Sequence, residues 1–495
     1  MTLALRLQAL LLTLTLAAGA ACTPVVNPAT GERQYTAIGP QEEVRIGQEE
    51  HPRVLAQYGG AYADRGVQNY VSGIGQRLAA VSELPELEFT FTVLDSEIVN
   101  AFALPGGYVY ITRGILALAQ NEAELAGVLG HEIGHVTARH AAQRVTRGQY
   151  AQVGAGLATI AGALLLGETG AQLGQQLGGL GAAVWVQGYS REQELEADQL
   201  GIRYLAAAGY DPSAMATFLG SMRANDRLQG QLRGSPQEAG GVPSWLASHP
   251  RTEARIEQAA AAVEAATPGE TVLRRDPYLD AIDGMVFADS PEQGFIRGRE
   301  FLHPELRLGF TAPEGFRLAN SPTAVVGQDR QGRAMIFTSA PSRSRNMVTH
   351  LTQEWAPNQR LQDVQRTEIG GRPAAVGFGR ATLGRQQGNA MLAAVEGSGD
   401  TVYRFVYFTR GSMDRATIRD FERSLTSFRT LSRAELADLR PLRIQTVTVR
   451  EGDTIDSLSR RMEVDELPRE WFEVLNALDR RPLRPGDRVK IVRRG

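Results

Sequence analysis

Two histidines and a glutamate form the pattern in this sequence that is best suited to chemistry. His131, Glu132 and His135 have the spacing H-E-x-x-H. On a helix, residues four apart lie about 40° from each other around the axis, so both imidazoles can reach one metal ion. Glu132 then points to the side where a metal-bound water would lie, which suits a general base. The alternative is two core histidines that hydrogen bonds satisfy.

The residues around this pattern predict a buried helix. Asn121 followed by Glu124 is typical of an N-cap and its capping-box partner. A broad apolar surface follows, made by Leu125, Val128, Leu129, Ile133 and Val136. A buried helix that carries two histidines must provide partners for them, which favours a metal site.

A third ligand has to come from another part of the chain. His140 is the nearest candidate, but nine residues after His131 place it about 180° around the same helix. We therefore expect His140 to be a surface or cap residue.

The segment from Ser190 to Asp198 is the better source, because it holds four acids that helical geometry sorts onto two faces. The polar, solvated face carries Glu192, Glu196, Gln199 and Arg203. The opposite face carries Glu194, Leu195, Asp198, Gly201, Ile202 and Leu205. Two carboxylates on an otherwise apolar face need a cation or hydrogen-bond donors. Glu194 and Asp198 are thus the acids placed for a metal site, and ion pairs with buried arginines are the structural alternative.

These motifs together resemble metallopeptidase family 48, whose branches include the BepA, HtpX and prenyl-protease types. The resemblance rests on His131–His135, on Glu194–Asp198 preceded by Ser190-Arg191, and on the run Asn-Ala-Phe-Ala-Leu-Pro-Gly-Gly-Tyr-Val-Tyr from residue 100. Ser-His-Pro at 248–250 completes it. The match covers about residues 40 to 265 and favours the soluble periplasmic, BepA-like branch.

The resemblance implies one zinc ion, with His131, His135 and Glu194 as ligands and Glu132 as general base. Asp198 would be an outer-sphere or proton-donating acid. His249 would approach the metal, either as a switch that keeps the site latent or as a group that assists the oxyanion. Its structural alternative is a residue at the start of a helix before Pro250.

The expected order of elements also suits zinc peptidases of this type. Residues 41–57 and 66–82 have helical patterns, and residues 88–94 and 107–112 have strand patterns. In such enzymes an exposed edge strand beside the metal pairs with an extended substrate. We expect Tyr108–Thr112 to be that edge strand, and an ordinary hairpin strand is the alternative.

The N-terminus has the pattern of an export signal. Arg6 is the only charge in the first 31 residues, and the apolar run from Leu7 to Ala18 is short for a membrane span. Cys22 is the only cysteine of the chain and follows small residues that resemble a bacterial lipobox, although Gly19 replaces the usual leucine. We expect residues 1–21 to be a lipoprotein-type signal, Cys22 to be lipidated at the outer membrane, and residues 22–40 to be a linker. An ordinary signal-peptidase site that leaves a free thiol is the alternative.

Two further domains are expected after residue 270. In residues 271–435, alternating stretches at 306–316, 324–340, 372–383 and 391–409 predict strands, and 414–426 predicts a closing helix. This α+β pattern is vaguely similar to the Mog1/PsbP-like fold, and no catalytic constellation accompanies it. His303 and His350 are isolated and are expected to be structural or exposed.

The C-terminal stretch, residues 441–495, resembles a LysM module. Gly-Asp-Thr at 452–454, Leu475-Asn476 and Pro-Gly at 485–486 carry this resemblance. It implies a βααβ fold and peptidoglycan as a partner, whereas a degenerate module retained for packing is the alternative.

The sequence therefore predicts an α+β protein of about three domains: a mainly helical zincin-type metallopeptidase domain at 41–270, an α+β domain and a LysM-like module. The chain has 495 residues and a net charge of −3, so it shows no electrostatic footprint for nucleic acid. We expect a lipid-anchored periplasmic zinc endopeptidase that acts on misfolded or unassembled envelope proteins. The alternatives are a chaperone-like lipoprotein with a latent zinc site and a peptidoglycan-binding protein in which proteolysis is secondary.

Overall fold

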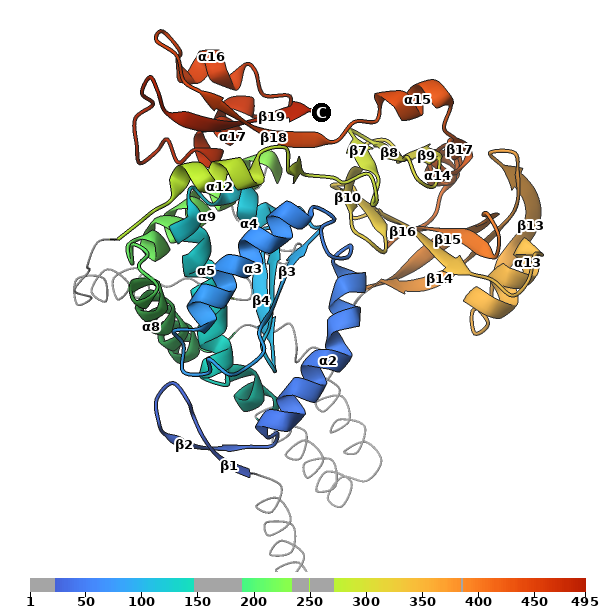
Figure 1. Ribbon diagram of the computed structural model, residues 1–495. Helices are drawn as coiled ribbons and strands as arrows, with labels where there is room; N and C mark the ends of the chain where they lie inside the picture. The colour runs from blue at the N-terminus through green and yellow to red at the C-terminus, as the bar shows by residue number, and fades with distance from the viewer. Residues whose placement is uncertain (1–22, 147–188, 234–248, 250–270, 384–385) are drawn as a thin grey trace, which may run out of the picture. The chain divides into compact units, whose positions relative to one another are not determined.

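A computed structural model describes residues 23–146, 189–233, 249, 271–383 and 386–495 (Figure 1). The expected signal peptide and Cys22 lie outside the described residues. The chain divides into two compact units. The first comprises residues 1–55, 61–285 and 444–493, and the second is formed mainly by residues 286–443.

The first unit is built around helix α5, Glu122–Thr137, nearly all of whose residues are buried. Asn121 is its N-cap and accepts a hydrogen bond from the backbone N–H of Glu124, as expected. Around α5 lie α3, α8, α9 and the strand β4 (Figure 1). The helices of this unit are α2 Pro40–Gln57, α3 Arg65–Ala79, α4 Arg113–Leu118, α8 Arg191–Ala207, α9 Ala214–Arg233 and α12 Arg275–Ile282.

Helix α8 packs closely against α5 because glycines face each other at the crossing. A Cβ atom added to Gly201 would lie only 2.9 Å from the backbone nitrogen of His131, and one added to Gly134 would lie 3.1 Å from the carbonyl of Ala197. Ser190 begins α8 with a complete capping box to Gln193. This close approach brings the buried face of α8 against the histidines of α5.

A small sheet in the first unit has the strand order β3-β5-β4. Strand β3 is Thr90–Leu94, β4 is Ala101–Leu104 and β5 is Tyr108–Thr112. Because β5 pairs in parallel with β3 and antiparallel with β4, the expectation that Tyr108–Thr112 is an edge strand is wrong. Among the described residues, the edge strand on that side is β4. Its four residues do not have an alternating pattern of apolar and polar side chains, so the sequence did not predict it. Gly106 and Gly107, with φ of 80° and 90°, form the turn from β4 to β5.

The chain enters this unit through a hairpin of β1, Thr23–Val26, and β2, Arg33–Thr36. No helix among the described residues combines the length and the apolarity that a membrane crossing requires. Part of the linker expected at 22–40 thus forms the paired strands β1 and β2.

The second unit contains a large antiparallel sheet with the order β10-β11-β12-β16-β15-β14-β13. A smaller sheet, β17-β9-β8-β7, and helix α14 enclose a core rich in phenylalanine and tyrosine. Asp414 caps α14 at its N-terminus, and the helix lies where the sequence predicts a closing helix. The strands are β7 Phe295–Arg297, β8 Glu300–His303, β9 Leu308–Thr311, β10 Arg317–Asn320, β11 Val325–Gln328, β12 Ala334–Pro341, β13 Gln362–Ile369, β14 Arg372–Leu383, β15 Gln386–Glu396, β16 Thr401–Thr409 and β17 Arg429–Thr430. The helical segments are α13 Met347–Thr349, the π-helix η2 His350–Trp355, α14 Arg415–Thr426 and α15 Arg433–Asp438.

The C-terminal segment has the βααβ order that the sequence predicts, with β18 Leu442–Thr448, α16 Ile455–Ser459, α17 Pro468–Leu475 and β19 Arg488–Arg494. The short strand β6, Val286–Phe287, extends its sheet in the order β19-β18-β6. Residues 444–493 fall within the first compact unit.

A buried lysine contributes to the packing of this segment. Lys490, the only lysine in the sequence, donates from Nζ to the carbonyls of Ala117 and Ala119, both at 2.7 Å. The amide of Gln120 also donates to the carbonyl of Leu475 at 3.0 Å. The C-terminal segment is thus attached to the end of α4 and to the loop between α4 and α5.

Candidate metal centre

Helix α5 presents two imidazoles and a carboxylate on one buried face. His131 and Glu132 are fully buried, and His135 is 2% exposed. The Nε2 atoms of His131 and His135 lie 3.0 Å apart, as expected for histidines one turn apart that face a common point.

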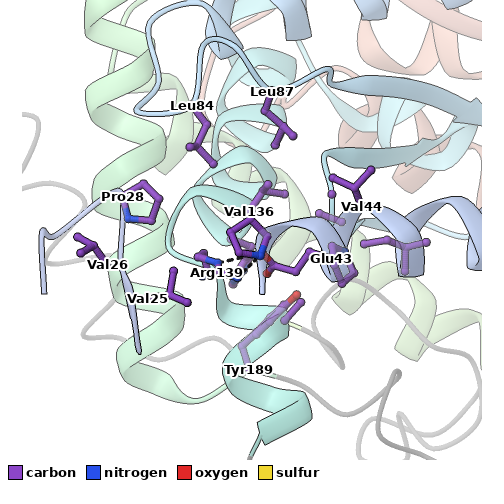
Figure 2. Close-up of a pocket in the computed structure, with 17 residues that line it drawn as sticks. Val25, Val26, Pro28, Glu43, Val44, Leu84, Leu87, Val136, Arg139 and Tyr189 are labelled. Carbon is purple, nitrogen blue, oxygen red and sulfur yellow. Dashed lines mark hydrogen bonds and ion pairs between the residues drawn. The ribbon is translucent and has the colours of Figure 1, made fainter. Parts of the chain in front are cut away.

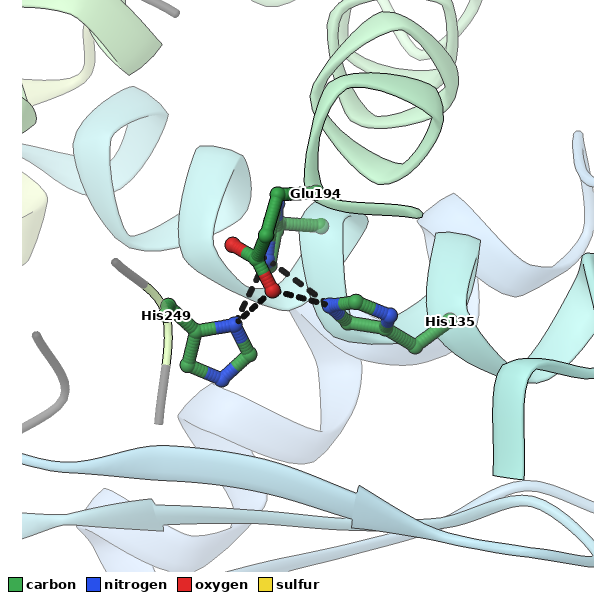
Figure 3. Close-up of side chains that lie close together, drawn as sticks. His135, Glu194 and His249 are labelled. Carbon is green, nitrogen blue, oxygen red and sulfur yellow. Dashed lines mark hydrogen bonds and ion pairs between the residues drawn. The ribbon is translucent and has the colours of Figure 1, made fainter. Parts of the chain in front are cut away.

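Glu194 approaches this pair from α8, as the sorting of helical faces predicts. Its Oε1 lies 3.5 Å from Nε2 of His135, and its Oε2 lies 3.7 Å from Nε2 of His131. Figure 3 shows the carboxylate reaching between the rings of His135 and His249.

His249 joins the same group from a distant part of the sequence. Its Nδ1 lies 3.2 Å from Nε2 of His131 and 2.9 Å from Oε1 of Glu194 (Figure 3). Its other nitrogen, Nε2, lies 3.6 Å from Oε1 of Glu132. His249 therefore stands between the expected ligands and the expected base.

The donor set fits a zinc ion. One ligand atom from each of His131, His135, Glu194 and His249 lies within 4.8 Å of the others. Four atoms placed tetrahedrally about 2.0–2.1 Å from a common centre would lie about 3.3 Å from one another. With Oε1 as the ligand atom of Glu194, the separations of 2.9, 3.0, 3.2 and 3.5 Å bracket that value. Two or three imidazoles with one carboxylate are also the donor types that Zn²⁺ takes in proteins.

Asp198 lies behind His131 rather than in the ligand group. Its Oδ1 is 2.8 Å from Nδ1 of His131, so the imidazole nitrogen that faces away from the site has a carboxylate partner. Such a contact fixes the ring orientation and leaves Nε2 directed at the metal position.

His140 has a corresponding position behind His135, contrary to the expectation of a surface or cap residue. It is fully buried, and its Nδ1 lies 2.8 Å from Nδ1 of His135. His140 does not continue the same helix, because α5 ends at Thr137 and Arg139 has a left-handed φ of 56°, which turns the chain back. Glu196, expected on the solvated face, lies 3.1 Å from Nε2 of His140.

Tyr189 also contacts the site and was not singled out from the sequence. Its ring stacks on that of His135, with centroids 3.7 Å apart and an interplanar angle of 16°. The guanidinium of Arg144 lies 3.8 Å from the centre of the same tyrosine ring. Burial raises the pKa of Tyr189 to about 12, so its hydroxyl stays protonated at neutral pH. Its position just before the cap residue Ser190 is the only sequence signal that could have pointed to it.

The electrostatics suit metal binding. Burial lowers the pKa of His135 well below its usual value, which keeps the ring neutral and able to donate a lone pair. Burial acts to raise the pKa of Glu194, but the neighbouring His249, His135 and His131 outweigh it and lower that pKa overall. Glu194 is therefore a carboxylate at neutral pH.

Comparisons with known proteins agree with this geometry. Residues 66–263 match the model of Peptidase family M48. A Vibrio cholerae protein is 33% identical over 260 residues, which are 52% of this chain and 50% of that protein. The Beta-barrel assembly-enhancing protease of Escherichia coli is 31% identical over 213 residues, 42% of each chain. The Mitochondrial metalloendopeptidase OMA1 of Schizosaccharomyces pombe is 30% identical over 237 residues, 47% of this chain and 64% of that protein.

The chain spans about half the length of the curated relatives that it matches. A solved structure of cyanobacterial PsbP from Synechocystis matches 26% of this chain and 91% of that one, at 12% identity and a TM-score of 0.21. For the segment that carries the metal centre, the motif and the family model point the same way: residues 66–263 match Peptidase family M48.

Proposed function

We propose that this chain is a zinc-dependent metalloendopeptidase that cleaves misfolded or unassembled proteins of the bacterial envelope. The observation that carries the proposal is the convergence of His131, His135 and Glu194 on one point, with Glu132 buried beside them. The similarity to relatives from E. coli and S. pombe that are named as proteases supports it.

The chain's own residues divide the reaction between them. Zn²⁺, when held by His131, His135 and Glu194, supplies Lewis acidity that polarises a peptide carbonyl and acidifies a water molecule. Glu132 accepts the proton of the attacking water and passes it to the leaving amine. Asp198 acts through His131, whose ring it orients from 2.8 Å, and this contact favours an outer-sphere role over proton donation.

Strand β4 is the proposed track for the substrate backbone. It is an edge strand among the described residues, and its neighbour β5 occupies its other side. An extended peptide could add to β4 by main-chain hydrogen bonds, which would make binding largely independent of sequence. Such binding suits a protease that acts on unfolded chains.

His249 gives the proposed enzyme a latent state. A catalytic zinc site has three protein ligands and one open position, whereas a closed site has four. With Nδ1 among the ligand atoms and Nε2 3.6 Å from Glu132, His249 occupies the space that water and substrate need. Activity would then require His249 to withdraw.

The experiment measures zinc content and casein cleavage by the wild type, Glu132→Gln and His249→Ala. We expect all three to bind zinc, and Glu132→Gln to lose at least ~100-fold in cleavage rate because the general base is gone. His249→Ala should be more active than the wild type if the site is latent. An active Glu132→Gln protein would refute the mechanism. Zinc binding without cleavage by any variant would favour the chaperone-like alternative.

We also propose that Cys22 is lipidated and that this lipid anchors the protein to the outer membrane, on its periplasmic side. Their support is the apolar N-terminal run and the lone cysteine after small residues. Mass spectrometry of the mature N-terminus tests them, because a diacylated Cys22 and an unmodified one differ in mass.

Peptidoglycan binding by the C-terminal segment is a second candidate function, favoured by its βααβ element order. Because Lys490 is buried against the loop before α5, deletion of the segment would also disturb the metal centre. The test should therefore use the full-length Glu132→Gln protein in a sacculus pull-down, with soluble N-acetylglucosamine oligomers as competitor. Binding that these oligomers abolish would support the glycan partner, and no binding would contradict it.

A further inference from the structure

A cavity of about 200 Å³ lies directly beside His135 (Figure 2). Its walls come from the N-terminal hairpin, helix α2, the 84–87 segment, strand β4 and the end of α5. The lining includes the aliphatic side chains of Val25, Val26, Val44, Leu84, Leu87 and Val136. A dry cavity of about 150 Å³ with comparable walls can hold a benzene ring, so this one can accept an aromatic side chain.

A buried ion pair interrupts these apolar walls. Arg139 is 4% exposed, and its Nε and Nη2 donate to Oε2 of Glu43 at 2.9 and 2.6 Å. Nη2 also donates to the carbonyl of Ile38 at 3.3 Å, whereas Nη1 is buried and has no hydrogen-bond partner among the described residues. Figure 2 shows the Glu43–Arg139 pair in the middle of the lining residues. An unmatched buried donor is costly unless a ligand supplies an acceptor.

The cavity also touches both parts of the proposed catalytic apparatus. His135 lines it on one side and belongs to the metal-binding group on the other. Ala103 and Leu104 of the edge strand β4 line it as well. A peptide that adds to β4 with its scissile bond at the metal would therefore extend a neighbouring side chain into this cavity.

We propose that the cavity is the specificity pocket of the protease and that it selects tyrosine, and other bulky apolar side chains less strongly, next to the scissile bond. This rests on the proposed function. The ring of a tyrosine would be buried against the aliphatic walls, and its hydroxyl oxygen would accept a hydrogen bond from Nη1 of Arg139. Glu43 already balances the charge of Arg139, so the pocket offers no net attraction to an acidic side chain.

The first test is cleavage mapping on a mixed peptide library, with zinc-loaded wild type and His249→Ala. We expect cleavage next to tyrosine to exceed cleavage next to alanine by at least ~10-fold, with phenylalanine and leucine between them. Leu84→Trp should fill the pocket, abolish that preference and retain cleavage next to small residues. Val81→Trp is the matched control, because Val81 is 39% exposed and does not line the cavity. Equal behaviour of the two variants, no side-chain preference, or a preference for glutamate would overturn the proposal.

A second test does not depend on cleavage. Calorimetric titration of the full-length Glu132→Gln protein with N-acetyl-tyrosinamide should detect binding that weakens at least ~10-fold in Leu84→Trp and is unchanged in Val81→Trp. Absence of peptide cleavage by any zinc-loaded protein would refute the proposed protease activity. This titration would still test whether the cavity binds a tyrosine side chain. No saturable binding to either Glu132→Gln or its Val81→Trp derivative would refute the pocket itself.

Discussion

The Nδ1 atoms of His135 and His140 lie 2.8 Å apart, and Glu196 lies 3.1 Å from the other nitrogen of His140. One histidine in this contact must donate and the other accept, so the pair fixes a tautomer as well as a ring orientation. His131 has a simpler partner, the carboxylate of Asp198 at 2.8 Å. The Nδ1 atom of His135 thus contacts another imidazole, whereas the Nδ1 atom of His131 contacts a carboxylate.

We predict that His140→Ala weakens zinc binding by about 10- to 100-fold, the usual effect of losing an outer-sphere partner. Glu196→Gln should have a smaller effect, because it keeps an acceptor for His140. Zinc affinity is measured by competition with a chromogenic chelator. Gln199→Ala, an exposed change on the same helix, is the control. If His140→Ala bound zinc as tightly as this control, the contact would have no role at the metal.

Asp198→Asn separates the two roles that the sequence allows for this acid. As a positioning residue, Asp198 should contribute to zinc affinity, so the variant loses about 10- to 100-fold in affinity but keeps most of its kcat when saturated with zinc. As a proton donor, it should contribute to kcat, with zinc affinity little changed. Zinc titration and casein turnover at saturating zinc measure both quantities. A fall in kcat alone would contradict the positioning role.

Lys490 offers a direct readout of whether the C-terminal segment stays docked. Because it is the only lysine and is fully buried, amine-reactive reagents should leave it unmodified in the native protein and label it in urea. Peptide mapping by mass spectrometry measures the labelled fraction, with the N-terminal amine as an internal positive control. Rapid labelling of Lys490 under native conditions would contradict a stably docked segment.

The same lysine makes stability depend on pH. Burial lowers its pKa well below the usual value, so between that folded value and about 10.5 the unfolded chain binds more protons than the folded one. Stability therefore rises with pH in this interval. Lys490→Met removes this pH dependence of the stability. It also leaves the carbonyls of Ala117 and Ala119 unpaired, which costs about 1–3 kcal/mol of stability for each. The gap in Tm between wild type and variant should widen as pH rises, and parallel curves would contradict the prediction.

The candidate site could be predicted from the sequence where a single helix decides the geometry. The spacing of His131 and His135, and the face that carries Glu194 and Asp198, follow from helical periodicity, and the structure brings these side chains together. Glu124 was also recognised as part of the start of α5, although its side chain bonds the backbone N–H of Gln120 rather than closing a capping box.

Predictions failed where the chain leaves regular structure or where distant segments meet. His140 was misplaced because the helix ends three residues before it, and β4 was missed because Ala101–Leu104 is short and poor in β-branched residues. The docking of Lys490 depends on carbonyls about 370 positions away, which no local pattern encodes. The position of His249 in the ligand group came from the family resemblance and not from its spacing.

His303 is expected to make the second unit sensitive to acid. It lies at the end of β8, 8% exposed, and its Nδ1 accepts a hydrogen bond from the backbone N–H of Leu306 at 3.3 Å. Burial lowers the pKa of His303 to about 4. Below pH ~6.5 the unfolded chain therefore binds a proton that the folded unit does not, and stability falls as pH decreases from 6.5 to 4. The loss at pH 4 amounts to about 3 kcal/mol.

His303→Asn should reduce this acid sensitivity, since an asparagine oxygen can accept the same hydrogen bond and does not titrate. Hydrogen exchange of peptides from β8 and β9, followed between pH 4.5 and 7 and corrected for the intrinsic rate, measures the local stability. The exposed substitution Glu305→Gln is the control. The wild type should lose protection in this region as pH falls, and His303→Asn should lose less. The same loss in both proteins would show that another group titrates, because His303 is the only group altered between them.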